Sequence, residues 1–205
     1  YAVLGNNEAQ LAIFGFTERY LDAEGKFLYD NTLPLPDIEW GNSSEWRSRI
    51  IDLEQSTQYG YAWNKIYNLD VIRSCDLRYE LTPLIEDVLF NIQMFDHVEK
   101  VAAIDGEPYV YIKKRGSSIT NSNNYSAQEY YKVHRRRIQE LYDQLERWGV
   151  LDDRAKCILG SLFARYILST LERNCYAVPE GFGHADRVCW CKKAFDDPLF
   201  EELIP

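Results

Sequence analysis

Ile85-Glu86-Asp87-Val88-Leu89-Phe90-Asn91 is the stretch on which the interpretation of this chain depends, because it places two adjacent carboxylates near the start of a predicted helix. Pro83 suits the first position of that helix, which we expect over residues 82–98 with Ile85, Leu89, Ile92 and Phe95 as its buried stripe. Backbone amides at a helix start are unpaired, and the helix dipole there favours negative charge. A carboxylate at that position stays ionised and can accept a proton. Taken alone, the pair is better explained as two carboxylates that only stabilise the helix.

A second block, Ala62-Trp63-Asn64-Lys65-Ile66-Tyr67, combines three side chains that suit a sugar-phosphate ligand. The indole face of Trp63 can stack on a sugar ring, and the amide of Asn64 can exchange hydrogen bonds with hydroxyl groups. Lys65 offers a point charge to a phosphate. A buried tryptophan beside a surface lysine explains the same residues, and the block alone does not decide between the two interpretations.

The third block, Tyr111-Ile112-Lys113-Lys114-Arg115-Gly116-Ser117-Ser118-Ile119-Thr120, begins in a predicted strand and continues into a loop. Lys113 and Arg115 can bind a diphosphate, for which arginine has a bidentate geometry, and the hydroxyl of Ser118 can add a hydrogen bond. Such a clamp would stabilise a leaving nucleoside diphosphate. The alternative is a basic strand end that binds no ligand.

In this order and at these spacings, the three blocks resemble the acceptor-side half of bacterial family-2 glycosyltransferases, which have the A-type fold. In that family a small residue precedes Glu-Asp, and two variable positions and then Phe-Asn often follow. Ile85 stands where the common form has glycine, and Ser117 replaces another usual glycine. The resemblance covers residues 8–120.

The resemblance implies an inverting sugar transfer in which Asp87 is the general base and Glu86 is its neighbour or contacts the acceptor. Lys65 and Arg115 would face the diphosphate of a nucleotide-sugar donor. The acceptor would be a glycan or a lipid-linked sugar, as in envelope polysaccharide synthesis. A divalent metal, Mg²⁺ or Mn²⁺, would be held by the nucleotide-binding half, which we expect before residue 1 in a full-length parent. The chain alone should then bind no metal and be nearly inactive.

The strands that we expect form a mixed sheet, so the predicted fold class is α/β: part of an A-type glycosyltransferase sheet with a C-terminal helical extension. Residues 10–17 are apolar on both faces, which is typical of a buried strand. Residues 26–29 can return as a second strand. Residues 100–104 and 109–113 are predicted as a hairpin, joined by the tight-turn pair Asp105-Gly106.

From Ser126 the pattern becomes helical. Ser126 and Glu129 form a capping box ahead of a long amphipathic helix. A second long helix follows after a short loop, so the two should pack antiparallel. We therefore expect two domains, the acceptor-side half over residues 1–125 and a helical subdomain over residues 126–205.

Charge and length limit the classes of partner. The chain has 205 residues and a net charge of −9, which argues against nucleic acid because phosphate neutralisation needs a basic surface. The dense basic run His134-Arg135-Arg136-Arg137 is interpreted as a solvated helix face, with contact to anionic lipid headgroups as a second interpretation. Peripheral membrane contact therefore remains open.

The five cysteines form no regular framework, which indicates reduced thiols and a cytoplasmic location, with the inner face of the membrane as an alternative within that compartment. Cys189 and Cys191 could join Cys175 and His184 around a metal, but residues two apart on a helix point to different sides. No apolar run approaches the length of a bilayer span.

Two other functions compete with the enzyme. The first is a non-catalytic module that derives from a transferase fold and binds a glycan or a protein, suggested by the missing donor half and by Ile85. The second, a purely structural helical partner protein, ranks last because packing within the chain can explain the apolar faces of both long helices.

Overall fold

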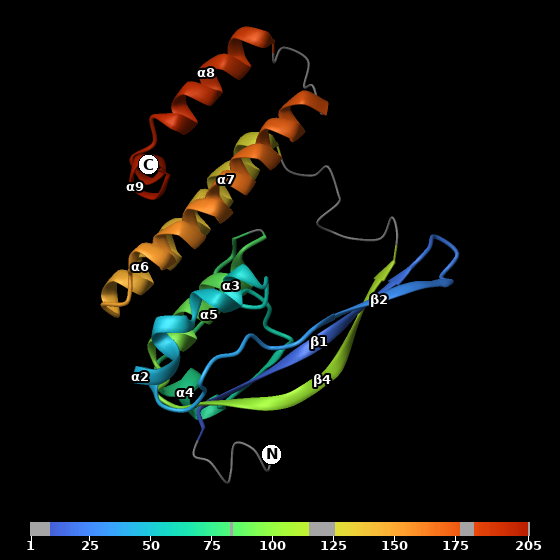
Figure 1. Cartoon of the computed structure of the whole chain (residues 1–205), viewed down its shortest axis with the longest axis vertical. Coiled ribbons are helices and arrows are strands. Elements are labelled where there is room, and N and C mark those ends of the chain that lie inside the picture. Colours follow the sequence, from blue (N-terminus) through green and yellow to red (C-terminus); the bar gives the residue numbers. More distant parts are fainter. Residues whose placement is uncertain (1–8, 83, 115–125, 177–182, 205) are drawn as a thin grey trace. The chain divides into compact units, whose positions relative to one another are not determined.

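The structure is a computed structural model that describes residues 9–82, 84–114, 126–176 and 183–204 (Figure 1). The chain divides into two compact units, Tyr1–Ser122 and Asn123–Pro205. Strands and short helices make up the first unit, and long helices make up the second.

The first unit contains a four-stranded mixed sheet with β1 (Leu11–Leu21) at its centre. On one side β1 pairs in parallel with β4 (Val101–Lys114). On the other side it pairs antiparallel with β2 (Phe27–Leu33) and with β3 (Lys65–Tyr67). The predicted α/β class with a mixed sheet is confirmed.

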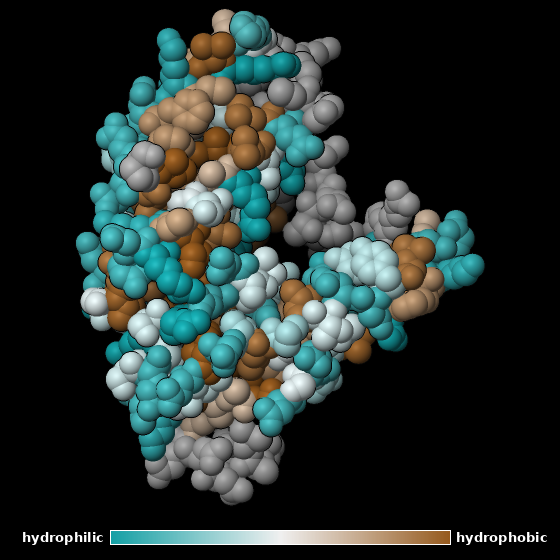
Figure 2. Space-filling model, viewed as in Figure 1, coloured by the Kyte–Doolittle hydropathy of each residue, from teal (hydrophilic) through white to brown (hydrophobic). Residues whose placement is uncertain are grey.

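The two halves of β1 differ in burial. Residues 11–16 are buried, as their continuous apolar sequence predicts, and helices cover this part of the sheet (Figure 1). Beyond it, β2 is largely exposed, and Phe27, Leu28 and Tyr29 are about half accessible. Figure 2 shows hydrophobic and hydrophilic side chains mixed along this end of the sheet.

The predicted hairpin over residues 100–113 is wrong. One continuous strand, β4, runs through Asp105-Gly106 and lies parallel to β1. The pairing jumps from Ile104 opposite Phe14 to Tyr109 opposite Phe16, so the extra residues form a bulge. Gly106 has a φ of +78°, a value that glycine adopts without a steric penalty. The Asp105-Gly106 pair therefore lies in a bulge of one continuous strand and not in a hairpin turn.

Helices pack on the covered part of the sheet, and their order is α2 (Ser43–Trp46), the 3₁₀ turn η1 (Arg47–Arg49), α3 (Ile51–Gln55), α4 (Leu69–Ser74) and α5 (Glu86–Asp96). The apolar stripe predicted for α5 is buried and comprises Ile85, Leu89, Ile92 and Phe95. The helix itself starts four residues later than Thr82, where we expected it. Its first two residues are therefore the two carboxylates.

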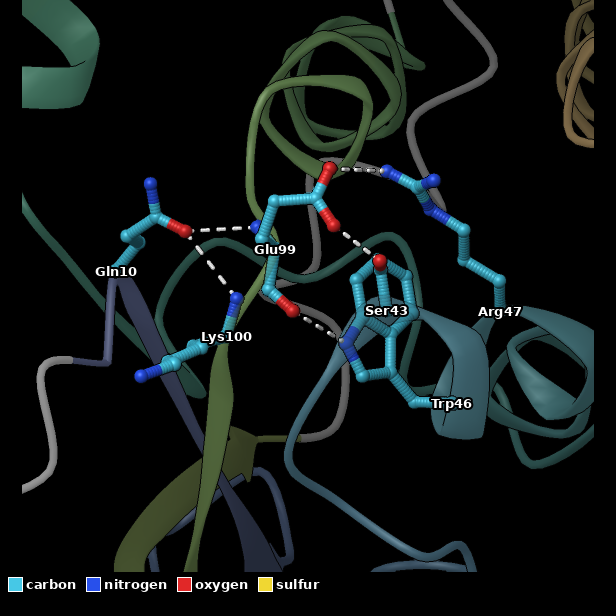
Figure 3. Close-up of polar contacts among 6 residues, drawn as sticks. All are labelled: Gln10, Ser43, Trp46, Arg47, Glu99 and Lys100. Atoms are coloured by element: carbon cyan, nitrogen blue, oxygen red, sulfur yellow. Dashed lines mark hydrogen bonds and ion pairs between the residues drawn. The ribbon is translucent and has the colours of Figure 1, made fainter.

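Glu99, just before β4, connects this strand to neighbouring elements through hydrogen bonds and an ion pair (Figure 3). Its carboxylate accepts hydrogen bonds from Ser43 and from Arg47, and its carbonyl lies 3.4 Å from the indole nitrogen of Trp46. The amide oxygen of Gln10, just before β1, accepts from the Glu99 and Lys100 backbone at 2.7 and 3.2 Å. These contacts connect α2 with the starts of β1 and β4.

The second unit consists of α6 (Ala127–Arg147), α7 (Asp153–Tyr176), α8 (His184–Phe195) and α9 (Pro198–Leu203). The capping box of Ser126 and Glu129 is confirmed. α6 and α7 pack side by side, as the short loop between them predicts (Figure 1). In the described part of the chain, none of the helices has the length and apolarity needed to cross a bilayer.

We predict that Gly15→Ala lowers the free energy of unfolding by about 2–3 kcal/mol, because it overpacks a site bounded by backbone. A Cβ at residue 15 would lie 2.8 Å from the carbonyl oxygen of Leu33 and 3.0 Å from the Cα of Pro34. Gly106→Ala is the control, since open space surrounds that Cβ and only φ is unfavourable. It should cost about 1–2 kcal/mol, the usual penalty of a left-handed φ. Equal losses in urea unfolding would contradict the proposed close approach.

Candidate functional site

The second sequence block, residues 62–67, lies against the loop that precedes it. The side chain of Lys65 connects the two by hydrogen bonds. Its Nζ lies 3.0 Å from the carbonyl oxygens of Gln58 and Tyr59, 2.6 Å from that of Tyr61 and 2.8 Å from the Asn64 side-chain oxygen. An ammonium has three protons, so these oxygens satisfy it completely. Lys65 is only 6% exposed. A contact between Lys65 and phosphate, as predicted from the sequence, would require it to leave these oxygens.

Asn91, in α5, also forms hydrogen bonds with this loop. Its amide nitrogen donates to the carbonyl oxygens of Tyr59, Gly60 and Tyr61 at 2.9, 3.0 and 3.3 Å. Its amide oxygen accepts a 2.7 Å hydrogen bond from the hydroxyl of Tyr67. Asn91 is completely buried. Two buried donors from two of the sequence blocks therefore fix one short segment, residues 58–61.

This segment places the backbone N–H of Ala62 against the carboxylate of Asp87, which accepts a hydrogen bond from it. Asp87 is half-buried in the first turn of α5. Burial raises the pKa of Asp87, and the neighbouring charge of Glu86 raises it further, whereas the Ala62 N–H and the Lys65 ammonium oppose the rise. Asp87 is thus a stronger base than an ordinary aspartate.

Lys65 and Asp87 influence each other across this arrangement. Burial lowers the pKa of Lys65 to about 7, and the charges of Asp87 and Glu54 act in the opposite direction. Burial also raises the pKa of Tyr67, with further contributions from Tyr79 and Asp87. The hydroxyl of Tyr67 therefore remains a hydrogen-bond donor over the whole physiological range.

Glu86 lies beside Asp87 with one carboxylate oxygen buried. That oxygen, Oε2, has no hydrogen-bond partner among the residues that the structure describes. A buried carboxylate oxygen without a donor is costly, so such an atom calls for a functional explanation. A hydroxyl group of an acceptor would supply the missing donor.

The departure at Ile85 from the family's usual glycine has a simple backbone explanation. Ile85 has a φ of −128°, which any residue can adopt, and its side chain is fully buried. The left-handed conformation falls one residue earlier, on Leu84, with a φ of +69°. Leu84 therefore bears the strain of the turn ahead of the carboxylates, and Ile85 contributes to the core.

Trp63 lies in a cluster of packed aromatic rings, which we call the aromatic wall. The cluster comprises Phe16, Tyr61, Trp63, Tyr109 and Tyr111. Its indole stacks on Tyr111 with 4.9 Å between centroids and 7° between planes. It also stacks on Tyr61 at 4.6 Å. Trp63 is half-exposed, but much of its ring surface is taken by other rings. Tyr109 and Tyr111 are 39% and 36% exposed, so they extend the wall toward solvent.

Lys113 continues the same face of β4, two residues beyond Tyr111. Its Nζ lies 2.5 Å from the carboxylate of Glu18 and 3.3 Å from the hydroxyl of Tyr20. Burial alone would raise the pKa of Glu18, but hydrogen bonds from Lys113, Tyr20 and Asn31 lower it overall. Lys113 keeps part of its side chain exposed, at 35%.

The structure thus brings the second block to Asp87 through the Ala62 N–H and the charge of Lys65, whereas Trp63 lies in the aromatic wall and Lys113 pairs with Glu18. Asn64 is buried and serves the backbone: its amide nitrogen points at the carbonyl oxygens of Phe14 and Gln58, at 3.5 and 3.4 Å. Arg115 and Ser118 lie outside the described residues, so their predicted phosphate contacts stay predictions.

Sequence reasoning did not assign roles to Tyr67, Tyr79, Asn91 or Glu18. A signal for Asn91 was present, because it lies four residues after Asp87 and so on the same side of the helix. Tyr67 closes the second block. Nothing in the sequence near Glu18 indicates that Lys113, 95 positions away, is its partner.

In the described ranges, no group of three or more His, Cys, Asp or Glu side chains is placed to hold a metal ion. The predicted metal ligands were expected in another part of a parent protein, so Mg²⁺ or Mn²⁺ stays a prediction.

No protein-family model and no curated protein sequence matches this chain significantly. Among solved structures, the chain is similar to the crystal structure of S. aureus TarS 1-349 in complex with UDP-GlcNAc, with a TM-score of 0.50 and 15% sequence identity. The match covers 98% of this chain and 52% of the TarS chain, so this chain spans about half the length of that structure. TarS is a glycosyltransferase. At this identity the likeness shows the fold alone, and it confirms a glycosyltransferase-like fold.

We predict that Asn91→Asp destabilises the first unit by about 2–4 kcal/mol, because an isosteric carboxylate cannot donate to three buried carbonyl oxygens. Asn68→Asp is the matched control. The Asn68 side chain only accepts, from the backbone N–H of Asp70 at 2.8 Å, and aspartate caps a helix equally well. Chemical unfolding measures both variants. A loss in N91D no larger than that in N68D would contradict the role given to Asn91.

We predict that Glu86→Gln lowers the pKa of Asp87, because the adjacent negative charge is one of the causes of its elevation. ¹³C NMR of the aspartate carboxyl groups can follow this titration in the isolated chain. The carboxyl group of Asp30, whose pKa is lowered by its hydrogen bonds to Arg19, is the internal reference and should be unaffected, because Glu86 is not among the groups that shift it. An unchanged or raised pKa of Asp87 in E86Q would contradict the electrostatic account.

Proposed function

We propose that this chain is the acceptor-side part of an inverting, nucleotide-sugar-dependent glycosyltransferase and that Asp87 is its general base. The observation that carries the proposal is the placement of Asp87. Its carboxylate accepts from the Ala62 N–H at the start of the second block, and it lies in the field of Lys65. Two blocks that the sequence related only by their order thus meet at one carboxylate.

The chemistry follows from the ionisation of that carboxylate. In the proposed reaction the hydroxyl oxygen of the acceptor attacks the anomeric carbon of the donor while its proton passes to Asp87. The bond from the anomeric carbon to the diphosphate breaks, and the nucleoside diphosphate leaves with the electron pair. Because the pKa of Asp87 is raised, its carboxylate accepts a proton more readily than an exposed one. The Ala62 N–H fixes the orientation of the base.

Other residues of the site act on the base or on the ligands. The buried Oε2 of Glu86 would accept from an acceptor hydroxyl. Lys65 and Asn91 act as positioning residues, since their hydrogen bonds fix the segment that orients Asp87. Lys113, whose side chain is 35% exposed, would contribute its positive charge toward a phosphate, and Arg115 and Ser118 would follow it along the chain. The aromatic wall around Trp63 would contact the sugar.

The whole enzyme would also contain the nucleotide-binding half with its Mg²⁺ or Mn²⁺ ion, which would neutralise the diphosphate of the donor. We propose a glycan or lipid-linked acceptor, in envelope polysaccharide or glycan synthesis at the cytoplasmic face of the membrane. The family-2 resemblance of the three blocks supports this, together with the glycosyltransferase-like fold.

A second candidate is a non-catalytic module that binds a glycan or a protein. Its support is that the two described lysines assigned to phosphate already have partners within the chain, namely Lys65 on backbone carbonyls and Lys113 on Glu18. In such a module the aromatic wall would bind a ligand, and Asp87 would have no chemical role.

We predict that Asp87→Asn in the full-length gene product lowers sugar transfer at least roughly 100-fold, as loss of a general base does. The matched control is Asp70→Asn, because Asp70 is also the second residue of a helix but is exposed. It should transfer sugar at the wild-type rate. Transfer is measured with labelled nucleotide sugar, and thermal melting verifies that both variants fold. Near-normal turnover in D87N, with glycan binding retained, would favour the non-catalytic module.

A further inference from the structure

The interface between α6 and α7 contains a cluster of aromatic rings around one buried histidine. His134 stacks face to face on Tyr166, with 4.0 Å between centroids and 7° between planes. The ring of Tyr130 contacts His134 edge-on at 4.3 Å. All three residues belong to the second unit, and none is used by the proposed transfer reaction.

Three guanidinium groups lie over these rings. The Cζ of Arg173 lies 4.2 Å from the ring centroid of Tyr130. Those of Arg165 and Arg137 lie 5.5 and 6.0 Å from the centroid of Tyr166. Cation–π contacts of this kind stabilise a guanidinium group without neutralising its charge.

Two arginines of this cluster lack the ion pairs that neighbouring arginines form with acidic residues of the described chain. Arg135 pairs with Asp197, and Arg136 pairs with Glu140, so half of the basic run identified in the sequence is neutralised. By contrast, neither Arg165 nor Arg173 forms an ion pair with a described acidic residue. A chain with a net charge of −9 thus concentrates positive charge at one place on its helical unit.

His134 adds an independent observation. It is only 7% exposed, and its Nδ1 atom is buried without a hydrogen-bond partner in the described part of the chain. Burial lowers its pKa to about 3, and the charges of Arg137, Arg173 and Arg165 lower it in the same direction. The imidazole is therefore neutral at physiological pH, so one ring nitrogen carries a proton that it can donate. The basic run is not the solvated face that the sequence suggested at this position.

We propose that His134, Arg137, Arg165 and Arg173 form a binding site for a phosphate-bearing ligand on the helical unit. Guanidinium groups match phosphate oxygens in bidentate geometry, so three of them near one neutral imidazole suit a phosphate group. Such a group would supply the negative charge that Arg165 and Arg173 lack among the described residues, and acceptors for their N–H groups. The phosphate can belong to a soluble ester or to a lipid headgroup.

The test uses the intact chain and two probes, sodium pyrophosphate and vesicles of phosphatidylglycerol, with phosphatidylcholine vesicles as the neutral reference. Arg165→Gln/Arg173→Gln removes two charges of the cluster. Lys192→Gln/Lys193→Gln removes two exposed charges of α8 and is the matched control. Calorimetry and vesicle sedimentation measure binding at constant ionic strength, and NMR follows the imidazole signals of His134.

We expect saturable binding by the wild type, weakened roughly tenfold or more in R165Q/R173Q and nearly unchanged in K192Q/K193Q. The imidazole signals of His134 should shift during the titration. Binding of pyrophosphate identifies a soluble phosphate ester as sufficient, whereas binding of phosphatidylglycerol vesicles alone identifies a lipid source. Absence of binding to both probes, or equal losses in the two double variants, would overturn the proposal.

Discussion

The candidate site depends on one short piece of backbone, residues 58–61, whose carbonyl oxygens are held from two directions. Lys65 reaches them from the strand that follows the segment, and Asn91 reaches them from α5. Inside a protein, buried carbonyl groups must find donors, and here two buried side chains supply them. The next residue, Ala62, then presents its N–H to Asp87. The orientation of the base is therefore a consequence of how this segment is fixed.

The same arrangement explains why a costly buried lysine is present. An ammonium next to Asp87 and Glu54 limits the rise in the pKa of Asp87, because it favours the ionised carboxylate. Without that charge, burial and Glu86 would shift Asp87 further toward its protonated form, which cannot act as a base. Lys65 thus combines two effects, since it fixes the backbone and keeps the neighbouring carboxylate ionised. An uncharged donor such as Asn91 can provide only the first.

Short sequence motifs predicted the features that depend only on residues close together in the chain. The capping box at Ser126 and the buried stripe of α5 are present, because a few neighbouring residues decide them. The Asp105-Gly106 pair failed as a hairpin signal, because pairing with β1 outweighed the turn preference and absorbed the extra residues as a bulge. The roles of Lys65 and Lys113 were also not predictable, since neither the carbonyls around Lys65 nor the distant Glu18 is visible in a linear motif.

Both candidate sites combine buried polar atoms that have partners with buried polar atoms that have none among the described residues. Asn91 and Lys65 have partners for their donors, and both hold backbone in place. Glu86 Oε2 and His134 Nδ1 are buried without described partners, and each lies beside other ionisable groups. A folded chain tolerates such atoms where a ligand completes their hydrogen bonds, because otherwise their desolvation is uncompensated. A neutral acceptor hydroxyl fits the acidic pair, whereas a phosphate fits the cluster of arginines. The two units would then recognise chemically different groups, each with buried polar atoms that a ligand would complete.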